Sequence, residues 1–147
     1  MSHTIEDIAK INRESARAKT GIRIIELSSL GEVIPLAEAE GIRQQLLANK
    51  VPVKQLTNVS SFAGWTAVDG FVDQCMQVRH ISEQELPIQT EVLIFDDTVA
   101  FYRVEPEVTL TVVTEAAVAA QQKALFDLAW QQAAPMALAS DGSTIAS

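Results

Sequence analysis

Cysteine is almost absent from this chain: Cys75 is the one cysteine among 147 residues. A single cysteine excludes a disulfide within the chain and a metal site built from several thiolates. Because disulfide frameworks are typical of secreted domains, we predict a reducing environment and a cytoplasmic location. Cys75 itself is expected to be a small residue of the core.

Positive charge is also scarce. The chain has 11 lysine and arginine residues against 19 aspartate and glutamate residues, which gives a net charge of -8. Proteins that bind nucleic acids or anionic membranes neutralise phosphates with lysine and arginine. We therefore predict no direct nucleic-acid partner and no membrane partner.

Long apolar runs are missing as well. No uninterrupted stretch approaches the roughly 20 apolar residues that cross a membrane, and no basic start precedes an apolar leader. Hydrophobic residues make up 48% of the chain and charged residues 20%, as in ordinary folded proteins. The composition predicts one domain with a substantial core.

The common catalytic and cofactor motifs are not found. The sequence contains no glycine-rich phosphate loop before a lysine, no dinucleotide fingerprint, no His-Glu-x-x-His zinc pattern and no nucleophile elbow. No cofactor and no metal site is therefore predicted.

The spacing of apolar residues predicts alternating helices and strands. In the first half we expect a helix over residues 1–19, a strand over 22–27, a helix from Pro35 to about Ala48, and a strand over 51–57. A strand, a helix and a second strand with a short return form a crossover unit. The two strands are therefore predicted to be parallel.

The second half is predicted to add a hairpin and a long helix. Two antiparallel strands are expected to flank a tight turn at residues 96–98, because aspartate tolerates unusual backbone angles. The remaining expected elements are a loop and short helix over 60–76, strands over 78–81, 89–95, 99–104 and 107–113, and a helix from Thr114 to near Pro135. We predict an α/β domain with a mixed sheet at 21–138, preceded by an N-terminal helix at 1–20 and followed by a flexible tail at 139–147.

The segment from Ile88 to Tyr102 resembles an active-site strand of the phospholipase D family. That family carries His-x-Lys-x-x-x-x-Asp, and aligning its aspartate with Asp96 places Gln89 at the histidine and Glu91 at the lysine. Residues 103–106 stand where the family has Gly-Ser-x-Asn. The element order over residues 22–136 resembles one phospholipase D half-domain. Residues 125–136 are similar to the last helix of sensor domains in some helix-turn-helix transcription regulators, which also lack the catalytic pair.

The resemblance implies a domain without phospholipase D catalysis. Gln89 has no comparable nucleophile, and Glu91 places negative charge where a phosphate would bind. We therefore predict a non-catalytic ligand-binding or sensing module that pairs with itself as a homodimer, as the family's half-domains do, and that takes a small molecule or a protein as partner. The predicted ligand-binding residues are Gln89, Glu91, Asp96 and Arg103 near a shared cleft, with Asn58 at the carboxyl end of a parallel strand.

Two alternatives to this interpretation stay open. The first is a hydrolase in which Asp96 and Glu91 act as an acid and base pair. The second is a structural protein-interaction domain with a vestigial cleft. The individual residues also have simpler explanations: Asp96 and Asn58 as turn residues, Gln89 and Glu91 as solvent-facing, and Phe126 with Trp130 as core.

Overall fold

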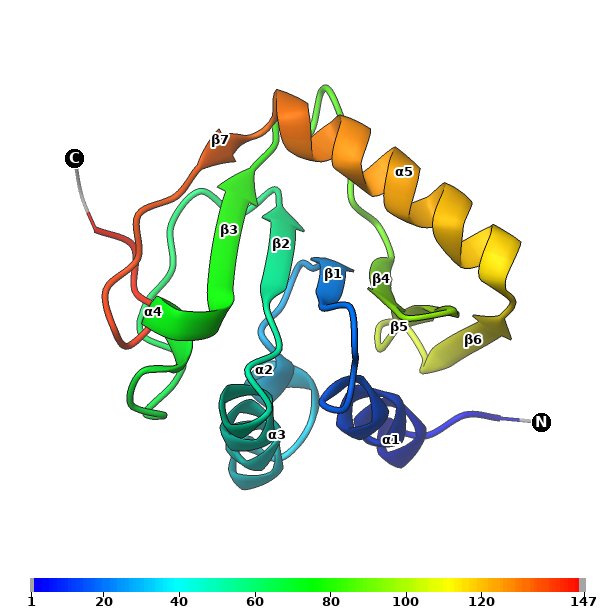
Figure 1. Ribbon diagram of the computed structural model, residues 1–147, viewed down its shortest axis with the longest axis horizontal. Coiled ribbons are helices and arrows are strands. Elements are labelled where there is room, and N and C mark those ends of the chain that lie inside the picture. Colours follow the sequence, from blue (N-terminus) through cyan, green and yellow to red (C-terminus); the bar gives the residue numbers. More distant parts are fainter. Residues whose placement is uncertain (1, 146–147) are drawn as a thin grey trace.

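The computed structural model describes residues 2–145 of the chain and shows helices and strands arranged around one sheet (Figure 1). In chain order the elements are α1 (Ile5–Ser15), β1 (Ile22–Ile25), α2 (Leu30–Val33), α3 (Leu36–Ala48), β2 (Val53–Thr57), α4 (Phe71–Cys75), β3 (Met76–His80), β4 (Glu91–Phe95), β5 (Thr98–Arg103), β6 (Thr109–Thr114), α5 (Ala116–Gln132) and β7 (Ala134–Pro135).

The sheet is mixed, as predicted. Its seven strands follow the order β6-β5-β4-β1-β2-β3-β7. The pairs β1–β2 and β2–β3 are parallel, which confirms the predicted parallel pair. Strands β4, β5 and β6 extend the sheet in antiparallel pairs. The sequence did not predict α2 or β7. The short strand β7 follows α5 in the chain and pairs with β3.

Helices cover both faces of the sheet. Figure 1 shows α1, α2 and α3 on one side and α5 across the other. Strand side chains alternate between these layers: Leu93 belongs to the buried cluster under α1 and α3, whereas Ile94 packs with Phe126 and Trp130 of α5. The rings of Phe126 and Trp130 stack with centroids 5.7 Å apart, which confirms their predicted core position. Cys75 is buried in the first cluster, as expected.

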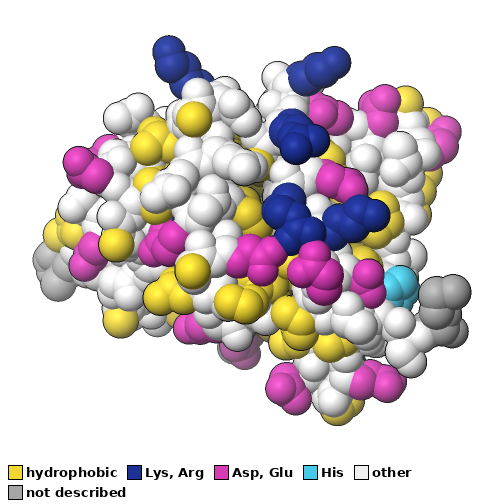
Figure 2. Space-filling view, turned by 90° about the horizontal axis from the view of Figure 1, so that it is seen from below, with side chains coloured by type: hydrophobic (Ala, Val, Ile, Leu, Met, Phe, Trp, Pro, Cys, Tyr) yellow, Lys and Arg dark blue, Asp and Glu magenta, His cyan; other side chains and the backbone are white. Residues whose placement is uncertain are grey.

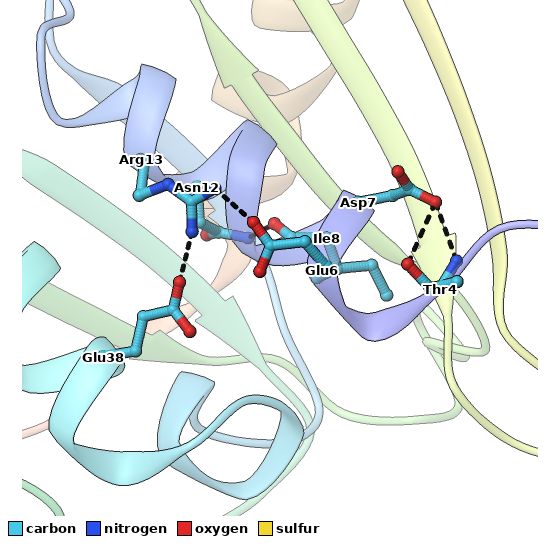
Figure 3. Close-up of polar contacts among 7 residues, drawn as sticks. All are labelled: Thr4, Glu6, Asp7, Ile8, Asn12, Arg13 and Glu38. Atoms are coloured by element: carbon cyan, nitrogen blue, oxygen red, sulfur yellow. Dashed lines mark hydrogen bonds and ion pairs between the residues drawn. The ribbon is translucent and has the colours of Figure 1, made fainter.

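Polar contacts lie at both ends of α1, and one of them joins the helix to α3. The backbone N–H of Thr4 donates to Asp7 Oδ2 at 2.8 Å and so caps the first turn. Near the other end Arg13 contacts Glu6 at 2.5 Å and also pairs with Glu38 of α3 (Figure 3). The apolar side of α1, including Ile8, is buried against the sheet. The N-terminal helix is therefore packed on the rest of the domain.

The β4–β5 hairpin confirms the predicted turn. Phe95 pairs with Thr98, so Asp96 and Asp97 form the connection. Asp96 adopts φ +50°, a left-handed conformation that aspartate reaches more readily than most residues. Its Oδ1 accepts hydrogen bonds from the backbone N–H groups of Lys19 and Thr20, at 3.0 and 3.2 Å, and from the Thr20 hydroxyl. Asp96 therefore attaches the hairpin to the α1–β1 connection.

The described part of the C-terminal segment also makes specific contacts. Leu138 forms a bridge with Thr144, and the N–H of Trp65 donates to the carbonyl of Asp141 at 2.8 Å. Residues 146 and 147 of the predicted flexible tail lie outside the described residues. The last long helix was predicted from Thr114 and begins two residues later, at Ala116, because Glu115 caps it by accepting from the N–H of Val118 at 2.7 Å.

Candidate functional site

A pocket lies where β4 begins and β5 ends. It has a volume of about 420 Å³, within the size range of small-molecule sites. It is lined by Leu27, Ser28, Val33, Gln89, Glu91, Tyr102, Arg103, Val104 and Glu105. We call it the β4–β5 pocket. The structure thus brings together three of the five predicted site residues: Gln89, Glu91 and Arg103.

Strand pairing positions the polar floor of this pocket. Glu91 of β4 is paired directly with Tyr102 of β5, so their side chains share one sheet face. On its other side β4 pairs with β1, with Ile24 opposite Leu93. Continuing that register by two residues places Glu26 opposite Glu91. The sheet therefore carries a row of three polar side chains, Glu26, Glu91 and Tyr102, on the face covered by α1 and α3.

Glu91 is buried, with 7% of its surface exposed, contrary to the simpler expectation that it faces solvent. Its Oε1 accepts a hydrogen bond from the N–H of Ser28 at 3.2 Å. Burial raises the pKa of Glu91 to about 7, an effect that the Ser28 N–H opposes and the nearby charge of Glu32 increases. At neutral pH the side chain is therefore close to half protonated.

Glu91 and Tyr102 contact each other inside this row. Glu91 Oε2 and the Tyr102 hydroxyl are both shielded from solvent and form no hydrogen bond of good geometry, but the Tyr102 hydroxyl lies close enough to lower the pKa of Glu91 by hydrogen bonding, against the effect of burial. Tyr102 is only 1% exposed, and burial together with the Glu91 and Glu26 carboxyls raises its pKa well above the usual value. Buried polar groups in folded proteins are usually hydrogen-bonded, and these two are placed to bond to each other.

Glu26 lines a smaller cavity beside the β4–β5 pocket. That cavity, of about 90 Å³, is lined by Glu26, Asn12 and Arg43 among others, and it shares Leu27 and Ser28 with the larger pocket. Burial, and then the charge of Glu91, raise the pKa of Glu26 well above its usual value, while Arg43 opposes the shift. The Arg43 guanidinium donates to the Trp65 carbonyl at 3.0 Å and lies 3.5 Å from Glu40.

Sequence reasoning missed Glu26 and Tyr102 as site residues. A signal for Glu26 was present: it follows Ile22 and Ile24 at alternate positions and so points to the same buried sheet face. A carboxylate at a core-facing position of an apolar strand is unusual. Tyr102 offered no comparable signal, because its place beside Glu91 depends on the register between two strands.

Asp96 and Asn58 do not join the pocket. Asp96 lies at the opposite end of β4 from Glu91, about 16 Å away at the rise of an extended strand. The carboxyl groups of glycosidase pairs are separated by only about 5 to 9.5 Å. The distance therefore gives no support to an acid and base pair of Asp96 and Glu91.

Asn58 holds loops together. Its Nδ2 donates to the carbonyls of Ile81 and Leu86, at 2.8 and 3.0 Å, and its Oδ1 accepts from the N–H of Ile88 at 2.9 Å. With these bonds its amide is engaged within the protein, between the end of β2 and the segment that leads into β4.

Within residues 2–145, no group of three or more histidine, cysteine or acidic side chains is arranged to hold a metal ion. No helix in the described part of the chain has the length and apolar character needed to span a membrane.

Lysine and arginine are unevenly distributed over the surface. Figure 2 shows them gathered, among acidic side chains, on the face seen from below Figure 1, where α1 and α3 lie. We call this the α1–α3 basic surface. Five basic residues lie on α1, on the loop that follows it and at the end of α3: Lys10, Arg13, Arg17, Lys19 and Lys50. The same two helices carry five acidic residues, Glu6, Asp7, Glu14, Glu38 and Glu40, and Arg13 is paired with two of them. A hydrogen bond from Asn49 Nδ2 to the Ala16 carbonyl at 2.8 Å brings the ends of the two helices together.

Comparison with known proteins gives a fold likeness and no family. No protein-family model matches the chain, and no curated protein matches it. Among solved structures, the chain is similar to TrmBL2, an archaeal chromatin protein whose structure is described as showing a novel mode of DNA binding. The TM-score is 0.62 at 16% sequence identity, over 90% of this chain and 51% of TrmBL2. The chain thus spans about half the length of TrmBL2.

This comparison contradicts the prediction that excluded nucleic acid as a direct partner. TrmBL2 has the same fold over most of this chain and is described as binding DNA, so the fold gives no ground for that exclusion. The physical reason for the error is that a net charge of -8 averages over the whole chain. It does not describe a local surface such as the one where α1 and α3 present their basic side chains. What the comparison shows for this chain is an α/β fold shared with TrmBL2.

Proposed function

We propose that this domain is a non-catalytic sensing module that binds a small molecule in the β4–β5 pocket. The observation that carries the proposal is the pocket itself, a space of about 420 Å³ whose lining includes three of the predicted residues, Gln89, Glu91 and Arg103. Small-molecule sites combine apolar walls with a few polar groups. This lining has that composition, because Leu27, Val33 and Val104 lie beside the polar residues.

A non-catalytic role is supported by the residues that line the pocket. Gln89 and Glu91 occupy the positions that a phospholipase D-like half-domain fills with its nucleophile and its cation. Asp96, the one element of that motif present here, is engaged with Lys19 and Thr20 at the far end of the hairpin. We keep the phospholipase D-like half-domain as the proposed origin of the fold, because the order of elements and the position of the hairpin agree with it.

Ligand sensing can be tested without knowing the ligand. We would screen a library of neutral, anionic and cationic metabolites for compounds that raise the melting temperature. Val33→Trp fills the pocket and should abolish every such shift, and Val104→Trp on the same lining serves if Val33→Trp does not fold. Val118→Trp, at a valine on the exposed side of α5, is the matched control. If no compound raises the melting temperature, or if the shifts persist in both pocket variants, the proposal is wrong.

A second candidate function is contact with DNA through the α1–α3 basic surface. The lysine and arginine side chains that Figure 2 shows together on the face of α1 and α3 favour it, because phosphate contacts supply most of the affinity for nucleic acid. The likeness to TrmBL2 places the same fold in a DNA-binding chromatin protein. Sensing and DNA contact are compatible, since the pocket and this surface involve different residues.

We also propose that the domain forms a homodimer through the edge of β6. This strand is at one end of the seven-stranded sheet, next to β5. Residues Thr109–Thr114 carry no charge, and Val112 is 43% exposed. Natural proteins usually protect such edges with charges or proline. In a chain of net charge -8, an uncharged edge is a place where two copies can meet with little repulsion.

A further inference from the structure

We propose that the smaller cavity beside the β4–β5 pocket binds a small neutral amide, with Glu26, Gln55 and Arg43 as its hydrogen-bonding partners. We call this space the inner cavity. The proposal goes beyond the function proposed above, because the two spaces share only Leu27 and Ser28. The ligand class is an uncharged molecule in which an N–H donor stands next to a carbonyl acceptor, such as a lactam, a urea or a primary amide.

The floor of the inner cavity is the sheet face that α1 and α3 cover. Gln55 of β2 is paired with Ile24 of β1 on one side and with Val78 of β3 on the other, and all three line the cavity. Glu26 follows β1 at the next position that points to this face. Arg43 reaches the cavity from α3. Ligands of open α/β sheets collect beyond the carboxyl ends of parallel strands, which is where Glu26 lies.

Glu26 and Gln55 place polar groups in the inner cavity that the protein itself does not satisfy. Their exposed fractions are only 7% and 9%, and among residues 2–145 neither side chain has a hydrogen-bond or ion-pair partner. The unpartnered polar atoms that are sealed from solvent belong to Glu91 and Tyr102 instead. The Glu26 carboxyl and the Gln55 amide therefore open onto the space that they line, where a ligand can reach them. Because buried polar groups are usually hydrogen-bonded, a partner for them is expected inside the cavity.

The Arg43 guanidinium adds donors to this set. Its side chain is 5% exposed, and Nη1 lies 3.0 Å from the Trp65 carbonyl and 3.5 Å from Glu40. The guanidinium also lies over the Trp65 ring, 4.8 Å from its centroid, which fixes its position. A guanidinium has five N–H donors. Since Nη1 makes both polar contacts, Nε and Nη2 are left to donate to a ligand.

The rest of the inner cavity is small and apolar. Its volume of about 90 Å³ is about three times the roughly 30 Å³ that a water molecule occupies in the liquid, and it is less than the roughly 150 Å³ of a cavity that takes benzene. Phe62, Trp65 and Phe71 line it, and the last two pack edge to face with centroids 6.1 Å apart. Such walls suit a ligand no larger than a five-membered ring, lying flat against an aromatic side chain.

The mixture of donors and acceptors selects the class of ligand. An ammonium group could donate to Glu26 but would meet the charge of Arg43, and an anion would meet Glu26 with Glu91 and Glu32 near it. An apolar molecule would leave Glu26 and Gln55 without partners, which is costly. A neutral amide donates to Glu26 and accepts from Arg43. The side-chain amide of Gln55 presents a donor and an acceptor side by side, so it can bond to both groups of the ligand.

Four small probes test the proposal: pyrrolidinone, cyclopentanone, pyrrolidine and glycine. The first three share one ring size. Pyrrolidinone has the N–H and the carbonyl, cyclopentanone lacks the N–H, and pyrrolidine lacks the carbonyl and is positively charged at about pH 7. Glycine brings both charges. Each probe is titrated into the full chain, and binding is followed through the backbone amide NMR signals of β2 and β3. Pyrrolidinone should bind, and each of the other three should bind about fivefold more weakly or worse, because it lacks a partner or must give up the hydration of a charge.

One substitution with a matched control tests the role of Gln55. Gln55→Leu keeps the approximate volume and removes the amide, so the affinity for pyrrolidinone should fall about tenfold. Gln77→Leu makes the same change at an exposed glutamine of β3 outside the inner cavity, and it should bind as the wild type does. Val33 lines the β4–β5 pocket and not the inner cavity. Pyrrolidinone binding should therefore persist in Val33→Trp.

The possible results separate this site from the β4–β5 pocket. Cyclopentanone, pyrrolidine or glycine binding as tightly as pyrrolidinone, or an equal loss in Gln77→Leu, would overturn the amide assignment. If pyrrolidinone does not bind, the inner cavity holds only water and the proposal is wrong. If Gln55→Leu does not fold, the comparison of the four probes on the wild type decides the question. In the metabolite screen, compounds whose effect persists in Val33→Trp and is lost in Gln55→Leu belong to the inner cavity, and the β4–β5 pocket is judged on the other compounds.

Discussion

Glu91 and Tyr102 face each other across β4 and β5, both are buried, and each has a polar atom that is shielded from solvent and forms no hydrogen bond of good geometry. Register explains their proximity, and burial explains the raised pKa of both groups. The Tyr102 hydroxyl lies close enough to lower the pKa of Glu91 by hydrogen bonding, so it opposes part of the effect of burial. The protonation of Glu91 therefore depends on how the two strands pair.

The first prediction concerns stability and pH. The pKa of Glu91 in the folded protein, about 7, lies above the ordinary 4.5. A raised carboxyl pKa means that the folded state holds the proton more tightly, so the stabilisation is complete below about pH 4.5 and is lost as the pH rises through 7. Between about pH 5 and pH 8 this single group should lower the free energy of unfolding by about 2 to 3 kcal/mol.

Glu91→Gln isolates that contribution. The free energies of unfolding of the wild type and the variant are measured in urea across this pH range. As the pH rises, the variant should gain about 2 to 3 kcal/mol relative to the wild type. Glu83→Gln, an exposed control, should follow the wild type at every pH. If the free energy of unfolding changes with pH in the same way for the wild type and Glu91→Gln, Glu91 does not titrate with a raised pKa.

The second prediction separates structure from function at Asp96. Asp96→Ala removes the acceptor of the Lys19 and Thr20 hydrogen bonds and places alanine at φ +50°. We expect a loss of about 1 to 3 kcal/mol in the free energy of unfolding, with ligand binding at the β4–β5 pocket unchanged. Asp96→Asn keeps an acceptor and tolerates this conformation, so its loss should be smaller.

Asp97→Ala is the matched control for Asp96. This neighbour is exposed and contributes its backbone carbonyl, rather than its side chain, to the contact with Glu115. Its replacement should change stability by less than about 0.5 kcal/mol. A comparable loss in both variants, or a loss of ligand binding in Asp96→Ala, would contradict the structural role of Asp96.

The sequence predicted the elements that depend on residues close together in the chain. The hairpin follows from residues that tolerate the turn, and the parallel pair follows from the helix between β1 and β2. The Phe126–Trp130 stack follows from a spacing of four residues. The polar row of Glu26, Glu91 and Tyr102 could not be found in this way, because it needs the register of three strands that are far apart in the chain.

The misplaced site residues have a different cause. The motif resemblance grouped Asp96 with Glu91, although Glu91 begins an extended strand and Asp96 lies in the turn directly after it. The length of the strand separates the two residues in space. Strand geometry alone was therefore sufficient to separate them. Asn58 had the expected position at the end of β2, but its amide is engaged by the loop that leads to β4.

The third prediction concerns self-association. If copies meet at the β6 edge, light scattering should give a mass twice the 16.0 kDa of the chain. Val112→Lys places a charge on the exposed face of that edge and should shift the protein to the monomer. Val118→Lys, on α5 and 38% exposed, is the control and should leave the mass unchanged. A monomeric wild type would exclude a stable dimer at the concentrations measured.

The fourth prediction concerns DNA. At about 50 mM salt, duplex DNA should bind the wild type, and the double variant Arg17→Glu with Lys50→Glu should bind at least tenfold more weakly. Arg17 and Lys50 lie at the adjoining ends of α1 and α3, so the double variant changes two positive charges of the α1–α3 basic surface to negative ones. Affinity should also fall as salt rises, and less steeply in the variant, because fewer phosphates are neutralised.

The control is Lys123→Glu on α5, which covers the other face of the sheet and should bind DNA almost as the wild type does. An equal loss in the control would mean that total charge governs binding, and no binding at low salt would leave sensing as the function of this domain.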